Sequence, residues 1–126
     1  PFDFPFDGGS IPASRRWTAR ALGFLRPHFH RVLTRHGCKT TDHFAGFALT
    51  GDFVADDLIR LFEKLPEGST EFMCHPGFLR DELRSASTRL KESREQELKA
   101  LTAPKLRPAL SQFQVQLVSF RDLSVR

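Results

Sequence analysis

The chain has 126 residues, a length that suits one domain. Apolar residues make up 40% and charged residues 27%, a balance typical of globular proteins that excludes a disordered tail or a fibrous repeat. The sequence has no run approaching the roughly 18 apolar residues of a membrane-spanning helix. Residues 1–10 also lack the basic start and apolar run of a signal peptide. We therefore expect no membrane partner.

The net charge of +4 is unevenly distributed. Residues 1–39 hold seven Lys and Arg against two Asp, so the positive excess lies in this first third of the chain. A basic helical face can bind nucleic acid. Because no recognition motif accompanies the charge, a solvated outer helix or one facing an acidic neighbour is the simpler interpretation.

The two cysteines, Cys38 and Cys74, are far apart in the sequence and fit no Cys/His zinc spacing. Lone thiols without a disulfide framework are typical of a reducing compartment. We therefore expect a cytoplasmic protein.

Turn formers dominate residues 1–12 and predict a loop. Helical spacing then runs over residues 13–36 and places an apolar stripe on one side. Pro27 interrupts this pattern and predicts a kink or a break near Leu25–Arg26, and Gly37 is a natural stop. The stripe consists of Trp17, Ala21, Leu25, Phe29, Val32 and Leu33.

The remaining sequence alternates between strand and helix patterns. We expect strands over residues 39–46, 69–74 and 115–120, and helices over residues 54–65, 88–101 and 104–110. In the helix over residues 54–65, the inward side chains are Leu58, Ile59, Phe62 and Leu65. This alternation predicts an α/β fold with about three parallel strands.

Two features suggest that residues 1–126 are a single but partial domain. Three parallel strands are few, because parallel sheets are normally larger and covered on both faces. The only methionine is Met73, while the chain opens at Pro1. We therefore expect either that residues were removed or that the chain is the tail of a longer protein.

His75 is the sharpest candidate for chemistry. Strand alternation places Glu71, Met73 and His75 on one side, and Phe72 and Cys74 on the other. His75 then lies at the carboxyl end of a parallel strand, the end at which ligands bind in α/β sheets. An imidazole there suits a general acid or an oxyanion stabiliser, because it titrates near neutral pH. The alternative is a histidine that caps a turn.

Arg94 shares the inward face of its helix with Leu90 and Leu98. A buried arginine needs a partner. We expect a structural ion pair with Glu71, and Glu97, one turn along the helix, is the alternative partner.

Several segments together resemble the C-terminal portion of the YdjC-like carbohydrate deacetylases. They are Thr41–Gly46 (TDHFAG), Gly68–Gly77 (GSTEFMCHPG), Arg89–Leu98 (RLKESREQEL) and Leu117–Leu123 (LVSFRDL). The resemblance implies part of a distorted (βα) barrel that removes acetyl groups from N-acetylated sugars or oligosaccharides. It also implies a divalent metal, Mg²⁺ or Zn²⁺.

The family holds its metal with an Asp-Asp-Phe-Gly motif and two histidines that this chain does not contain. Asp56-Asp57 is followed by Leu-Ile and does not match. We therefore expect the metal ligands to belong to an N-terminal part outside this chain, and the isolated chain to be inactive.

The resemblance also assigns roles to individual residues. His75 matches the histidine of the family's His-Pro-Gly motif and is the expected catalytic residue. Asp42, Phe44, Pro76 and Gly77 are expected near the sugar. For Phe44, packing in the core is the alternative.

A different class of function remains as an alternative. The chain would then be a non-catalytic interaction module, whose basic helix binds nucleic acid or a protein partner, or a module that pairs with a second copy through its open sheet edge.

Overall fold

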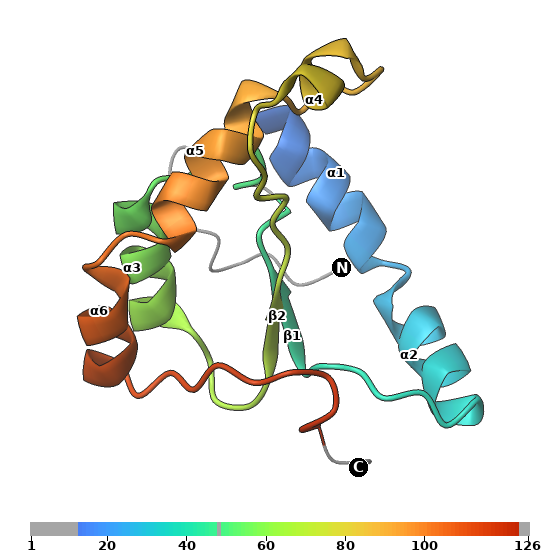
Figure 1. Cartoon of the computed structure of the whole chain (residues 1–126). Helices are drawn as coiled ribbons and strands as arrows, with labels where there is room; N and C mark the ends of the chain where they lie inside the picture. The colour runs from blue at the N-terminus through green and yellow to red at the C-terminus, as the bar shows by residue number, and fades with distance from the viewer. Residues whose placement is uncertain (1–12, 48, 124–126) are drawn as a thin grey trace.

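A two-stranded parallel sheet lies at the centre of the computed structural model, which describes residues 13–47 and 49–123. The expected loop over residues 1–12 lies outside the described residues. The elements in chain order are α1 (Ala13–Gly23), α2 (Arg26–Arg35), β1 (His43–Ala45), α3 (Ala55–Lys64), β2 (Thr70–Phe72), α4 (Asp81–Ser85), α5 (Glu92–Leu101) and α6 (Leu106–Gln112) (Figure 1).

The two strands confirm the expected parallel arrangement. β1 pairs with β2 in a register that sets Phe44 opposite Glu71 and Ala45 opposite Phe72. The sheet and its helices make an α/β structure. Two strands do not close a barrel, so the barrel implied by the resemblance remains a prediction.

The prediction of a third strand over residues 115–120 is wrong, because the structure describes these residues and none of them belongs to a strand. The chain leaves α6 through Gln114, whose φ of 55° turns the backbone away from the helix direction. The following segment crosses the amino-terminal end of the strands (Figure 1). A cavity of about 650 Å³ separates residues 65–72 from residues 113–123, so no hydrogen-bonded ladder joins this segment to β2.

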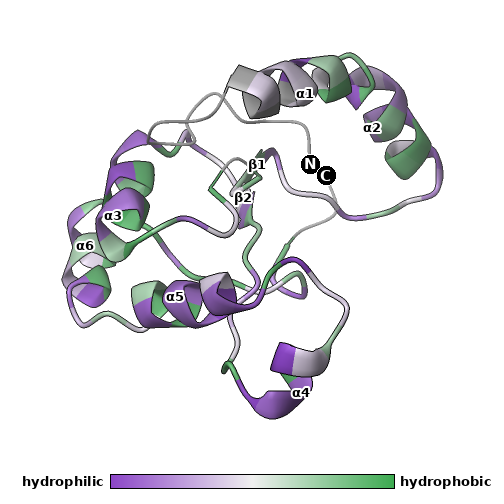
Figure 2. Ribbon diagram, turned by 90° about the horizontal axis from the view of Figure 1, so that it is seen from above, coloured by the Kyte–Doolittle hydropathy of each residue, from purple (hydrophilic) through white to green (hydrophobic). Residues whose placement is uncertain are grey.

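Helices lie on both sides of the sheet. In the two views, α3, α5 and α6 lie on one side and α1 and α2 on the other (Figures 1 and 2). The core is on the side of α3, and Phe72 of β2 meets Phe53 edge-on with ring centroids 5.5 Å apart. The core cluster is formed by Leu49, Phe53, Ala55, Leu58, Ala100 and Leu106.

Helix α3 confirms the predicted amphipathic spacing. Leu58 is fully buried, and Ile59 and Phe62 pack against the core cluster. Leu61, which is not among the side chains predicted to face inward, is also buried. None of the helices in the described parts of the chain is long and apolar enough to cross a membrane.

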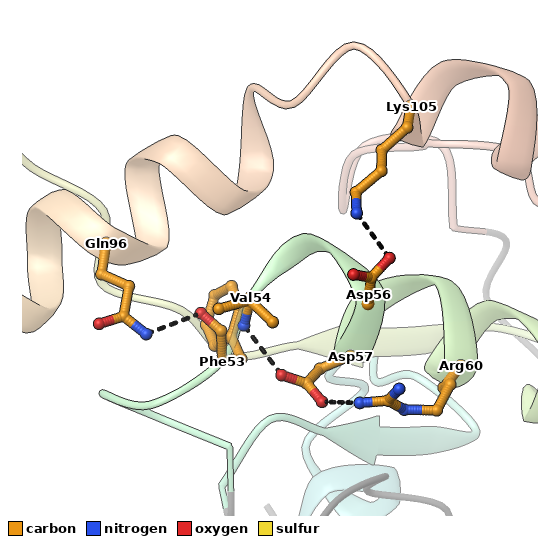
Figure 3. Close-up of polar contacts among 7 residues, drawn as sticks. All are labelled: Phe53, Val54, Asp56, Asp57, Arg60, Gln96 and Lys105. Carbon is orange, nitrogen blue, oxygen red and sulfur yellow. Dashed lines mark hydrogen bonds and ion pairs between the residues drawn. The ribbon is translucent and has the colours of Figure 1, made fainter.

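Polar contacts fix the start of α3 against its neighbours (Figure 3). The Asp57 carboxylate accepts the N–H of Val54, which would otherwise be an unpaired donor at the helix start. Asp56 pairs with Lys105 just before α6, with 2.6 Å between Oδ1 and Nζ. The Gln96 side chain of α5 donates to the Phe53 carbonyl at 3.5 Å. These contacts join α3, α5 and α6 into one layer.

The first helical region breaks where the sequence predicts. α1 ends at Gly23 and α2 begins at Arg26, with Pro27 in the first turn of α2. Much of the apolar stripe remains open to solvent, since Trp17 is 74% exposed and Leu25 is 55% exposed.

The helix expected over residues 88–101 begins only at Glu92, as α5. The Thr88 hydroxyl accepts the N–H of Leu90, and such local side-chain bonds compete with helix formation. The short helix α4 is an element that the sequence patterns did not predict.

Candidate functional site

His75 lies beyond the carboxyl end of β2, as the sequence analysis expected. The Met73 N–H donates to the Ala45 carbonyl at 2.9 Å, so the backbones of the two strands stay paired for one residue past the end of β2. Phe72 and Cys74 pack against the core cluster, which agrees with the predicted alternation. His75 is half-buried, and its Nδ1 atom is buried without a hydrogen-bond partner among the described residues.

Gly46 permits the backbone after β1 to lie close to the backbone of Met73, just after β2 and beside this site. Its φ of 102° lies in a region that favours glycine. A Cβ atom on Gly46 would lie 2.3 Å from the Met73 carbonyl oxygen. Only a residue without a side chain therefore fits where β1 ends against the exit of β2.

Glu97 of α5 is the buried charged residue of the described chain, with 1% of its surface exposed. Its Oε1 atom accepts the N–H of Gly51 at 2.7 Å, and its Oε2 atom accepts the N–H of His75. The carboxylate thus joins the loop after β1 to the exit of β2. Burial, and secondarily the negative charge of Glu97, raise the pKa of the neighbouring Cys74 thiol.

Arg94 makes two further contacts with the segment that contains His75. Its Nη1 donates to the His75 carbonyl at 3.4 Å, and its own carbonyl accepts the N–H of Gly77 at 3.1 Å. We call the hydrogen bonds from α5 to residues 75–77 the His75 anchor: the Glu97 carboxylate to the N–H of His75, Arg94 Nη1 to the His75 carbonyl, and the Gly77 N–H to the Arg94 carbonyl.

The expected ion pair between Glu71 and Arg94 is not formed in the described structure. Glu71 lines a cavity of about 230 Å³ with residues of α2, whereas α5 lies on the other side of the sheet. The Arg94 Nε instead donates to the Leu90 carbonyl at 3.1 Å. Glu97, the alternative partner, makes no ion pair within the described chain and bonds to backbone N–H groups.

Asp42 lies at the opposite end of the sheet from His75, because it precedes β1 while His75 follows β2. Its Oδ2 atom accepts both the N–H of Ser69, at 2.9 Å, and the hydroxyl of Ser69, at 2.8 Å. The Asp42 N–H donates back to the Ser69 hydroxyl oxygen at 3.1 Å. These bonds connect the starts of the two strands and give Asp42 a structural role.

Phe44 is buried in the middle of β1, at 7% exposure. This favours the alternative of core packing, and the structure brings neither Asp42 nor Phe44 beside His75. Pro76 is exposed and Gly77 half-buried, so these two do adjoin His75 at the edge of the sheet. Beyond them the Phe78 ring is 65% exposed, with the Arg80 guanidinium 5.4 Å from its centroid.

The role of Glu97 is the feature that sequence reasoning missed. A signal was present, since Glu97 is seven residues after Leu90 and four before Leu101, on the apolar side of the helix. A carboxylate on that side needs buried donors. The sequence does not say which donors they are.

The described residues contain no group of three or more His, Cys, Asp or Glu side chains that could hold a metal ion. Catalytic metal sites use about three protein ligands. The residues described in this chain therefore do not fit a complete metal centre.

Comparison with known proteins agrees with the resemblance seen in the sequence. The family described as YdjC-like protein matches residues 5–112. A carbohydrate deacetylase from Geobacillus stearothermophilus is 31% identical over 93 residues, which cover 73% of this chain and 38% of the relative. No solved structure matches the chain. A match to a family over most of the chain establishes membership, and the chain belongs to the YdjC-like protein family.

Proposed function

We propose that this chain supplies part of the active site of a carbohydrate deacetylase, within a full-length protein of the family. The reaction is hydrolysis of the acetamide of an N-acetylated sugar or oligosaccharide. Family membership and the relative named carbohydrate deacetylase support this proposal. The observation that carries it to particular atoms is the half-buried His75, held at the carboxyl edge of a parallel sheet.

His75 acts on the substrate in this proposal. Attack of water on the acetyl carbonyl, with the water's proton taken by a carboxylate base elsewhere in the full-length protein, creates a tetrahedral intermediate with a negatively charged oxygen. An imidazolium beside that oxygen stabilises the charge, or it gives its proton to the departing sugar amine. The unpartnered Nδ1 supports this assignment, because a buried polar atom without a protein partner calls for an explanation, and a catalytic role is one such explanation.

A divalent cation, Mg²⁺ or Zn²⁺, belongs to the proposal as a cofactor with ligands outside the described residues. Pro76 and Gly77 are proposed to contact the sugar, since they flank His75 at the same edge. Asp42 and Phe44 are not included, because Asp42 precedes β1 at the end of the sheet opposite His75, and Phe44 is buried.

Replacement of His75 in the full-length protein tests the proposal. His75→Ala should lower kcat for acetate release from an N-acetylated oligosaccharide by about 10²–10⁴-fold, the usual contribution of a general acid or base. The amount of metal bound per protein should not change. His28→Ala is the matched control, because this histidine is exposed on α2. An unchanged kcat in His75→Ala would remove His75 from the mechanism.

A second candidate is a non-catalytic interaction module, favoured by the exposed side chains of α1, of α2 and of the turn between them. Trp17 and Phe24 are 74% and 86% exposed, and Arg20 and Arg31 are exposed nearby in the sequence. Aromatic and cationic side chains together are typical of single-strand nucleic-acid binding. This candidate predicts retention on single-stranded DNA or RNA that weakens steeply with salt, and no retention at low salt would exclude nucleic acid as the partner.

A further inference from the structure

The backbone of His75-Pro76-Gly77 is held almost entirely by α5. Pro76 has no N–H, so this tripeptide has two backbone donors. The N–H of His75 goes to the Glu97 carboxylate, and the N–H of Gly77 goes to the Arg94 carbonyl. The carbonyl of His75 in turn accepts from Arg94 Nη1. The direction in which the His75 side chain leaves the backbone therefore depends on α5.

Burying the Glu97 carboxylate costs free energy, because it removes a charged group from water. The role of Glu97 must therefore be one that an apolar side chain could not fill. No cationic side chain pairs with it in the described chain, and its two backbone donors come from separate loops. Apolar side chains at such a position are often as stabilising as a buried charge. What only a carboxylate offers is two acceptor oxygens that point to two donors at once. The two bonds of the Glu97 carboxylate therefore fix the position of the His75 backbone relative to the loop at Gly51.

We propose that Glu97 is a positioning residue for His75, a statement that rests on the proposed function. Through its two oxygens, Glu97 fixes the exit of β2 relative to the loop at Gly51. The imidazole is thereby held where the acetyl group of the substrate reacts. Arg94 assists through the His75 carbonyl, with a weaker effect because that contact is 3.4 Å long.

Glu97→Gln tests this role with little change of shape. Glutamine keeps one acceptor oxygen but replaces the other with an NH₂ donor, so one of the two backbone N–H groups loses its partner. Misplacement of a catalytic group by about 1 Å can cost 10²-fold in rate. We expect Glu97→Gln to lower kcat about tenfold to hundredfold with KM nearly unchanged. A merely structural residue would not separate kcat from KM in this way.

Gln96→Ala is the matched control. Gln96 is the neighbouring residue of α5 and contacts the same loop at Phe53, but it makes no bond to residues 75–77. Its loss should leave kcat within about twofold of the parent value. Leu106→Ala adds a control for stability, because it disturbs the core on α6 without touching the His75 anchor.

Amide hydrogen exchange in the same variants separates this proposal from the proposed function. In Glu97→Gln the exchange rate of the His75 or the Gly51 amide should rise by about tenfold or more, while Gln96→Ala leaves both unchanged. If the parent protein releases no acetate, the proposed function fails, and the exchange rates alone decide whether Glu97 holds His75. Unchanged exchange at both amides, or a loss of kcat no greater than in Leu106→Ala, would overturn the positioning role.

Discussion

Gly46→Ala tests how the site is built, because the substitution should lower stability in two independent ways, through backbone strain and through a steric clash. The backbone φ of 102° disfavours any residue with a Cβ atom. The added Cβ would also lie 2.3 Å from the Met73 carbonyl oxygen and 2.9 Å from the Met73 nitrogen. Both contacts are with backbone, which cannot move aside by rotating a side chain. The exit of β2, two residues before His75, would have to shift.

The two costs can be given magnitudes. A residue other than glycine at an unfavourable positive φ costs about 1–3 kcal/mol. Forcing an extra carbon into an occupied space costs a further 1–3 kcal/mol or so. We therefore expect Gly46→Ala to lower the free energy of unfolding by roughly 2–6 kcal/mol, a large share of the about 5–15 kcal/mol typical of folded proteins.

Two other glycines separate these costs. Gly37 has a φ of 63° and nothing within 4 Å of an added Cβ, so Gly37→Ala should show the backbone cost alone, about 1–2 kcal/mol. Gly23, the last residue of α1, also has nothing within 4 Å and no positive φ. Gly23→Ala should leave stability unchanged or raise it by up to about 1 kcal/mol.

Urea denaturation followed by far-ultraviolet circular dichroism measures all three variants. The order expected for the loss of stability is Gly46→Ala, then Gly37→Ala, then Gly23→Ala. If Gly46→Ala were no more destabilised than Gly37→Ala, the close approach of β1 to Met73 would be refuted.

Three further predictions concern the core, the strand start and the thiols. Leu58→Ala should lower the free energy of unfolding by about 2–5 kcal/mol, since Leu58 is fully buried in α3; a loss below 1 kcal/mol in urea denaturation would contradict its place in the core. Asp42→Ala removes two hydrogen bonds from Ser69 to a charged acceptor and should cost about 1.5–3 kcal/mol, while the KM of the proposed deacetylase activity of the full-length protein stays unchanged; a raised KM at unchanged stability would restore Asp42 to the proposed sugar site. Burial raises the pKa of Cys74, so less thiolate forms at a given pH, and mass spectrometry after iodoacetamide treatment at pH 8 should find Cys74 alkylated about tenfold or more slowly than the exposed Cys38; equal rates would disprove the burial.

Local patterns in the sequence were sufficient for several elements. The spacing of apolar residues predicted α3 and its buried Leu58, and Pro27 predicted the break between α1 and α2. The alternation around β2 placed Phe72 and Cys74 on the same side and His75 at the end of the strand, and in the structure the side of Phe72 and Cys74 faces the core. These features depend on neighbours within one or two turns of the chain, which periodicity and proline chemistry report directly.

The sequence on its own also favoured a strand over residues 115–120, and there it failed. β-propensity records that side chains suit a pleated surface, but a strand exists only when another strand offers its edge. The turn at Gln114 carries this segment across the sheet, and the edge of β2 is not reached.

Only the tertiary structure decided the surroundings of His75. Glu97 bonds to Gly51, 46 residues away in the chain, and to His75, 22 residues away, while Asp42 bonds to Ser69 across 27 residues. The sequence placed His75 at the end of a strand, and the helical spacing of Glu97 carried a signal of its inward position that our sequence analysis did not use, since both features follow from position along one element. Which donors a buried carboxylate meets depends on how separate elements pack against each other, and that packing joined Glu97 rather than Glu71 to the candidate site.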